Sequence, residues 1–207
     1  MKVLLVNGSP HEHGCTYTAL SEVEGALRGE GIETGWFWIG NEPVRGCMGC
    51  RGCAGKGECV YDDAVNKLSR TAAEYDGFVF GSPVHFAGAA GGITSLMDRA
   101  FYSSRVSFAY KPAAAVVSAR RMGTTAALEQ MNKYFTLSSM PVVSSQYWNA
   151  VHGNTPEEVR QDLEGLQVMR TLGRNMAWLL RCIEAGRANG VEVPKPEPEH
   201  ARTNFIR

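Results

Sequence analysis

The residues best suited to chemistry in this sequence are four of its six cysteines, which stand close together. They are Cys47, Cys50, Cys53 and Cys59. Three closely spaced thiolates with a fourth slightly further along are typical of ferredoxin-type cluster ligands. A glycine precedes each of the first three cysteines, which lets the backbone turn tightly and aim N–H groups at sulfur. The window therefore predicts a site for a [4Fe-4S] cluster.

Other interpretations of this window stay open. Structural zinc also takes four thiolates, usually from two separated C-x2-C pairs. Disulfides are less expected, because they belong to oxidising compartments. The motif could also stand empty, with free thiols or with a cluster that is lost in air.

A second candidate is the segment from Asn7 to Thr16, which lies between an apolar run and an amphipathic one. Its glycines, Gly8 and Gly14, would let a ligand approach the backbone, and Ser9 and Thr16 offer hydroxyls. The segment has no lysine or arginine. Free N–H groups at a helix start can nevertheless hold a phosphate. We interpret the segment as a phosphate cradle, although an ordinary strand-to-helix turn would look similar.

Competing phosphate chemistries do not match this loop. An ATPase P-loop requires a lysine after its last glycine, where Cys15 stands. A phospho-acceptor receiver domain would have acids after its first and third strands, where Asn7 and Gly81 stand. No G-x-G-x-x-G follows the first apolar run, so a permanently bound dinucleotide has no dedicated turn.

Bulk composition narrows the class of partner. The 207 residues fit one domain with a full core. Acidic and basic residues balance at 21 each, so no overall field favours nucleic acid or an anionic membrane. The apolar start is too short for a signal peptide or a membrane span. We expect a cytoplasmic protein with a small partner.

Strand and helix patterns alternate along the chain. The expected strands are 2–6, 32–39, 76–80, 111–118 and 140–144, and the expected helices are 16–28, 62–73, 92–103, 124–137 and 155 to about 185. Gly81-Ser82-Pro83 should end the third strand. We expect one domain over 1–188 with a cysteine-rich loop insertion at 45–60, and a proline-containing C-terminal extended arm over 189–207.

Alternating strands and helices predict an α/β fold: a doubly wound, five-stranded parallel sheet with helices on both faces. We expect the strand order 2-1-3-4-5. Ligands of such sheets bind beyond the carboxyl ends of the strands, where the chain order reverses. The site should therefore lie on the loops 7–15, 81–92 and 119–123.

Two of these loops resemble the flavin loops of the NADPH-dependent FMN reductase family, which is flavodoxin-like. The similar segments are Asn7 to Thr16, and Gly81 to Gly88 with Met97-Asp98-Arg99 downstream. Three further segments, 121–125, 132–135 and 145–153, are similar to the iron-sulfur flavoprotein branch of that family. The resemblance covers roughly residues 1–180 and implies FMN.

The resemblance also implies which residues hold the cofactor. Those that would contact the phosphate are Ser9, His11, Cys15 and Thr16. Those that would line the ring are Pro83, Val84, His85, Phe86 and Gly88. Cys15 replaces the usual asparagine of the first loop, and His85 stands where tyrosine is common. Arg120 or Arg121 would stabilise negative charge near N1 and O2 of the ring, and Trp148 would cover it.

We therefore predict an FMN-dependent oxidoreductase that accepts electrons from NAD(P)H and passes them on through FMN and the cluster. The flavin does the chemistry, so no catalytic side chain is expected. The resemblance also suggests a homodimer or homotetramer. The alternatives are a non-enzymatic electron carrier or redox sensor, and a flavin-free protein that binds a phosphate ester.

Overall fold

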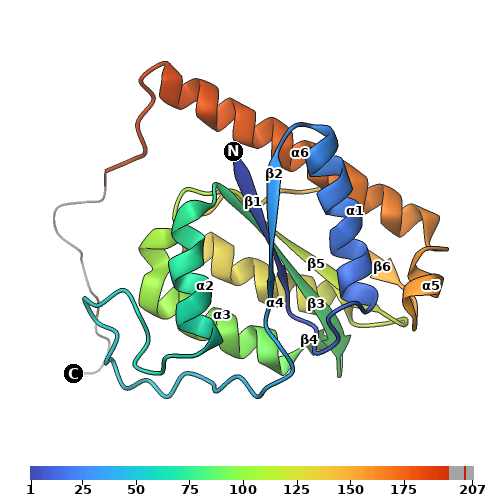
Figure 1. The fold of residues 1–207 in the computed structure, drawn as a ribbon, viewed down its shortest axis with the longest axis horizontal. Coiled ribbons are helices and arrows are strands. Elements are labelled where there is room, and N and C mark those ends of the chain that lie inside the picture. Colours follow the sequence, from blue (N-terminus) through green and yellow to red (C-terminus); the bar gives the residue numbers. More distant parts are fainter. Residues whose placement is uncertain (196–202, 204–207) are drawn as a thin grey trace.

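A parallel sheet forms the centre of the protein, which the computed structural model describes over residues 1–195 and 203. Five strands pair in the order β2 (Glu33–Trp38), β1 (Lys2–Asn7), β3 (Gly77–His85), β5 (Ala113–Ala119) and β6 (Ala150–His152), as Figure 1 shows. The short β4 (Gly88–Ala89) turns back against the end of β3. The predicted fold class is confirmed. The predicted strand order 2-1-3-4-5 is also confirmed when the antiparallel β4 is left out of the numbering.

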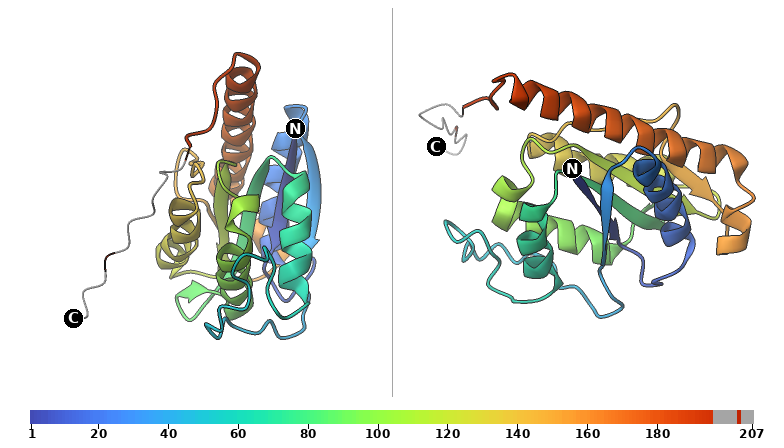
Figure 2. Two further views of the ribbon diagram at one scale, coloured as in Figure 1. Left: turned by 90° about the vertical axis from the view of Figure 1, so that its left-hand side faces the viewer. Right: turned by 45° about the horizontal axis from the view of Figure 1, so that its top comes forward.

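Helices cover both faces of this sheet (Figure 2). On one face lie α1 (Cys15–Gly29) and α6 (Leu163–Ala188), and on the other lie α2 (Ala64–Thr71), α3 (Gly91–Ser104) and α4 (Thr124–Leu137). The remaining helical segments are α5 (Pro156–Val159), η1 (Ala72–Glu74) and η2 (Arg105–Ser107). No helix in the described part of the chain is both long and apolar enough to cross a membrane.

The strands are apolar on both sides because each face of the sheet packs against helices. In β1, Val3 and Leu5 belong to the core under α1 and α6, whereas Leu4 and Val6 belong to the core under α2, α3 and α4. All four side chains are fully buried. The continuous apolar run, rather than an alternating one, is therefore what the sheet requires.

The third strand is longer than predicted. Gly81-Ser82-Pro83 does not end it, because β3 stays paired with β5 through Pro83 and then continues to His85. Gly81 serves packing instead: a Cβ there would lie 2.7 Å from side-chain atoms of Leu20 and Thr16 on α1. The glycine lets α1 approach the sheet and does not break the strand.

The fifth parallel strand lies later in the chain than predicted. The segment 140–144 contributes only an isolated bridge between Val142 and Ala113. The chain then leaves the sheet edge, where the Ser145 hydroxyl donates to the Val168 carbonyl. It returns as β6, beside the end of β5. The expected strand 140–144 thus meets β5 at a single residue, and β6 takes its place in the sheet.

The last helix is divided in two. Thr155 caps α5, since its hydroxyl accepts from the N–H of Glu158. Asp162 then caps a new helix by accepting from the N–H of Gly165, so α6 begins at Leu163 and ends at Ala188. Residues 189–195 of the expected arm contain no helix or strand. Positions 196–202 and 204–207 of that arm lie outside the described residues, and the division into domain and arm stays a prediction.

The contact between α1 and α6 gives a test of the fold. A Cβ on Gly173 of α6 would lie 2.8 Å from the Val23 carbonyl oxygen of α1, whereas a Cβ on Gly25 meets nothing within 4 Å. We expect Gly173→Ala to lower the free energy of unfolding by about 1–3 kcal/mol through overpacking. Gly25→Ala should raise it by roughly 0.5–1 kcal/mol. Urea denaturation of both variants measures this, and a stabilised Gly173→Ala would contradict the packing.

Candidate functional site

The loops that follow β1, β3, β5 and β6 meet at one edge of the sheet (Figure 1). The N–H of Gly8, after β1, donates to the carbonyl of Gly81 in β3 at 2.9 Å. The hydroxyl of Thr16 at the start of α1 lies 2.9 Å from that of Ser118 in β5. Gly153, after β6, donates to the end of β5 at 3.0 Å. The expected convergence of these loops is therefore present.

The predicted ring-binding residues lie on a tight hairpin. Phe86 and Ala87 form the turn between β3 and β4, with φ angles of 48° and 62°. Two left-handed residues in succession are typical of a type I′ turn and are costly without glycine. A Cβ on Gly123 would lie 2.5 Å from Ala87 Cα, so the loop after β5 packs directly on this hairpin. Pro83 and Val84 are half-buried, whereas His85 and Phe86 are exposed.

The loop after β1 is fixed by its own side chains. Asn7 donates from Nδ2 to the Glu12 carbonyl at 2.8 Å, and its Oδ1 accepts from the N–H of Ser9 at 3.1 Å. The indole of Trp38 donates to the Ser9 carbonyl at 2.8 Å. The N–H of His11 donates to Ser9 Oγ at 3.1 Å. These hydrogen bonds hold the loop in its conformation without a ligand.

The start of α1 has N–H groups that no side chain caps. Gly14 is the N-cap residue, and the first turn contains no acid. The first helical hydrogen bond runs from Thr18 N to the Gly14 carbonyl. Within the described residues, the N–H groups of Cys15, Thr16 and Tyr17 thus have no partner, as is usual for a first helical turn without a cap. Three N–H groups and the helix dipole suit an anion.

The side chains of this loop also suit an anion. Ser9 is buried, and its oxygen accepts from His11, which leaves its O–H able to donate. Burial raises the pKa of the Cys15 thiol above its usual range, so Cys15 stays neutral near pH 7 and does not repel an anion. His11 is exposed at the rim of the loop.

The two glycines of the loop have different roles. A Cβ on Gly8 would lie 2.6 Å from both the Gly81 carbonyl oxygen and Ile93 Cβ, so packing alone requires glycine there. A Cβ on Gly14 would lie 3.1 Å from His11 Cβ and 3.9 Å from Ser9 Oγ. That space is inside the loop, and the glycine keeps it open.

Arg120, Arg121 and Trp148 complete the predicted set. Both arginines are exposed in the loop after β5, and neither makes an ion pair or side-chain hydrogen bond within the described chain. Trp148 is 55% exposed. It lines a cavity of about 280 Å³ with residues that include Thr124 and His152. The cavity adjoins the start of α4, beside the loop that carries the arginines.

The structure adds residues that the sequence patterns did not single out. Ser118 pairs with Thr16, and Trp38 holds the carbonyl of Ser9. Asn149 Oδ1 is buried and has no hydrogen-bond partner among the described residues. Asn149 belongs to the segment 145–153 that carried a family resemblance, which was its only signal in the sequence. The other two become visible only when their strands are placed side by side.

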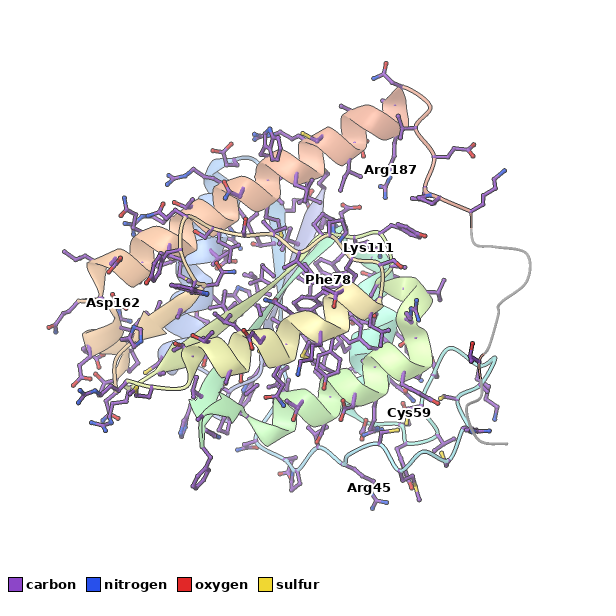
Figure 3. The ribbon with its side chains drawn as sticks, turned by 180° about the vertical axis from the view of Figure 1, so that it is seen from behind. Arg45, Cys59, Phe78, Lys111, Asp162 and Arg187 are labelled. Atoms are coloured by element: carbon purple, nitrogen blue, oxygen red, sulfur yellow. The ribbon has the colours of Figure 1, made fainter. Side chains whose placement is uncertain are left out.

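The four clustered cysteines lie away from this edge, in the long loop between β2 and α2. Figure 3 shows Cys59 and Arg45 in this loop, on the opposite side of the molecule from α6. All four thiols line one pocket together with Arg99 and Tyr102 of α3, and no histidine or carboxylate lines it. All six cysteines of the chain are free.

A thiol-only donor set suits iron–sulfur clusters or zinc and does not suit magnesium or calcium. In the described chain, however, no three potential metal ligands are already arranged around a common point. The residues therefore fit a cluster by donor type and shared location, and not by finished coordination.

The fourth cysteine is the best anchored of the set. The buried Asn66 of α2 accepts from the N–H of Cys59 at 2.8 Å and donates to its carbonyl at 2.9 Å. Next to it, Glu58 makes a two-pronged ion pair with Arg70, at 2.7 and 2.9 Å. Asp63 caps α2 by accepting from the N–H of Val65. The end of the cysteine loop is thus held by α2, whereas Cys47 and Cys50 are exposed.

Comparison with known proteins agrees with this geometry. The model of the NADPH-dependent FMN reductase family matches residues 1–155. An iron-sulfur flavoprotein from Methanocaldococcus jannaschii is 32% identical over 193 residues, which cover 89% of this chain and 100% of that protein. An iron-sulfur flavoprotein from Methanosarcina thermophila is 25% identical, with 90% of this chain and 99% of the relative covered.

Solved structures support the fold. A structure of RosB with bound 8-demethyl-8-formylriboflavin-5'-phosphate superimposes with a TM-score of 0.70 at 15% identity, covering 100% of this chain and 97% of RosB. A flavodoxin from the domain Archaea gives a TM-score of 0.61 at 14% identity, covering 87% and 99%. At these identities the likeness concerns the fold alone.

Proposed function

Because this chain belongs to the NADPH-dependent FMN reductase family, we propose that it is an FMN-dependent oxidoreductase that takes electrons from a nicotinamide nucleotide. The observation that carries the proposal is the uncapped start of α1, set among the loops that meet at the end of the sheet. A phosphate ester is the ligand that this arrangement suits.

In this proposal the phosphate binds at the N–H groups of Cys15 and Thr16 and at the Ser9 hydroxyl. Backbone and hydroxyl donors can hold a dianion because the helix dipole adds to them. The neutral Cys15 thiol and the absence of acids in the first turn keep repulsion low. Exposed His11 is placed to add a hydrogen bond at the rim.

The ring would lie against the hairpin of Pro83, Val84, His85, Phe86 and Gly88. Bound FMN supplies hydride and one-electron chemistry. The chain contributes orientation and charge: Arg120 and Arg121 have no acidic partner within the described residues, so either can stabilise negative charge on the ring. Trp148 and the buried Asn149 Oδ1 lie on the neighbouring segment, where one can cover a ligand and the other can accept from it.

We also propose that the cysteine loop holds a [4Fe-4S] cluster that exchanges electrons with FMN. The support is the pocket lined only by thiols among potential ligands, together with relatives named iron-sulfur flavoproteins. Zinc is the alternative that the same donor set allows. Iron analysis separates the two.

We further propose the electron partners, the assembly and the location of the protein. The partners are a small-molecule or protein electron donor and acceptor, and the assembly is a homodimer or homotetramer. A cytoplasmic location suits six free cysteines, because disulfides are rare in reducing compartments. The alternative function is a carrier or redox sensor that exchanges electrons only with other proteins.

The phosphate cradle can be tested by filling it. We expect Gly14→Val to weaken FMN binding at least tenfold, because the added side chain occupies the space before Ser9 Oγ. Riboflavin, which lacks the phosphate, should lose much less affinity. Gly25→Val is the matched control on the same helix and should leave FMN affinity unchanged. Titration of the apoprotein with each flavin, followed by fluorescence, measures both constants. Equal losses for FMN and riboflavin would place the phosphate elsewhere.

The oxidoreductase proposal is tested by mixing the FMN-loaded protein anaerobically with NADPH or NADH in a stopped-flow instrument. We expect at least one nucleotide to bleach the flavin absorbance in a single, concentration-dependent phase. A flavin that only dithionite reduces would support the carrier and contradict the reductase.

The cluster proposal predicts iron and acid-labile sulfide in nearly equal amounts in anaerobically purified protein. Cys50→Ala should lose most of the iron and keep its FMN, because the cysteine loop and the phosphate cradle share no residue. Cys182→Ala removes an exposed cysteine of α6 and should keep both. Zinc without sulfide in the unmodified protein would refute the cluster.

A further inference from the structure

Arg99 is a buried charge at the cysteine pocket. It lies on α3, and only 1% of its side chain is exposed. A buried guanidinium is costly unless its N–H groups are paired. Its position on the wall of the pocket that all four clustered cysteines line raises the question of what the charge does there.

One carboxylate compensates this charge. Nη1 of Arg99 donates to Asp63 Oδ2 at 2.6 Å, and Nη2 donates to Asp63 Oδ1 at 3.0 Å. Two parallel bonds of this kind fix the guanidinium plane as well as neutralise it. Because Asp63 also caps α2, Arg99 is held rigidly between α3 and α2.

The same guanidinium joins the two ends of the cysteine loop. Nη1 donates to the carbonyl of Arg45 at 3.1 Å, and Nη2 donates to that of Tyr61 at 3.2 Å. Arg45 precedes the first cysteine of the loop and Tyr61 follows the last. Arg99 therefore closes the loop around the thiols.

The last N–H, on Nε, points at sulfur, and Nη2 shares its two hydrogens among Asp63, Tyr61 and the same sulfur. Nε and Nη2 of Arg99 each lie 3.3 Å from Cys59 Sγ. Of the four clustered thiols, Cys59 is the one that receives side-chain N–H donors in the described chain. A planar fork with a full positive charge stabilises negative charge on the sulfur that it contacts.

We infer that Arg99 is a positioning residue that holds Cys59 as a cluster ligand and raises the reduction potential of the cluster through its positive charge and its N–H···S contacts. The inference rests on the proposed cluster. Reduction adds an electron, and its negative charge is shared with the ligating sulfurs. Hydrogen bonds to those sulfurs and nearby positive charge favour the reduced form.

A purely structural role for Arg99 makes a different prediction. If Arg99 only ties the loop to α2 and α3, its loss would reduce cluster content and stability but leave the potential of loaded protein unchanged. If the charge of Arg99 and its contact with sulfur act on the cluster, by contrast, loss of Arg99 must lower the reduction potential. Two substitutions of opposite sign therefore separate the roles.

The experiment is a spectroscopic redox titration of the FMN- and iron-loaded protein and its variants. We expect Arg99→Gln to disfavour cluster reduction about tenfold, which is 59 mV downward for a one-electron couple. Asp63→Asn should shift the potential upward, because it removes the compensating charge while asparagine still caps α2. Arg99→Lys keeps the charge without the fork and should fall between the unmodified protein and Arg99→Gln. It serves as the test if the glutamine variant does not load.

Arg70→Gln is the matched control. It also removes a positive charge that pairs with the end of the loop, but Arg70 is exposed and pairs with Glu58 and Asp62 rather than with a sulfur. In Arg70→Gln, the equilibrium constant for reduction of the cluster should change less than twofold. Iron-loaded protein whose potential is the same in the Arg99 variants as in the control would overturn the role of Arg99 alone. Unmodified protein without iron would overturn the cluster, and this inference with it.

Discussion

The parallel sheet brings the loops of the protein together. Every parallel strand delivers the loop after it to the same edge, so segments far apart in the chain meet there. The contacts are close: Gly8 bonds to Gly81, Thr16 to Ser118, and Gly123 packs on Ala87. Three of these positions, Gly8, Gly81 and Gly123, are glycines at which a Cβ would lie within 2.7 Å of a neighbouring segment. The edge is therefore a packed unit, and a ligand held there meets a nearly fixed surface.

The helix α3 connects the two candidate sites. Its start, at Gly91, follows the hairpin of β3 and β4, and Arg99 on the same helix contacts Cys59. Eight residues of α-helix span about 12 Å along the axis. A packed helix of this kind keeps the distance between the cysteine loop and the sheet edge constant. The side chains with which α3 packs into the core, Ile93 and Leu96 among them, are fully buried.

The sequence predicted the sheet, its strand order and the three loops of the candidate site, because these follow from alternating apolar runs and glycines. It failed where tertiary contacts decide. Pro83 stays in β3 because β5 pairs beside it, and Val142 reaches the sheet only as a bridge. Asp162 starts a new helix where a continuous one was expected. The bonds of Arg99 to Cys59 could not be predicted either, because forty residues separate them and only the packing of α3 on the cysteine loop brings them together.

The two sites treat negative charge in different ways, although the chain as a whole has a formal net charge of zero. At the start of α1 the donors are backbone N–H groups and hydroxyls, with a thiol kept neutral by burial. At the cysteine pocket the donor is a full guanidinium, itself compensated by Asp63. A dianion brings its own charge and needs oriented dipoles, whereas in the proposed cluster the thiolates would share an added electron and respond to a nearby fixed charge. Both sets of donors act over short distances and are partly buried. Salt should therefore weaken their interactions far less than it weakens those between exposed surface charges.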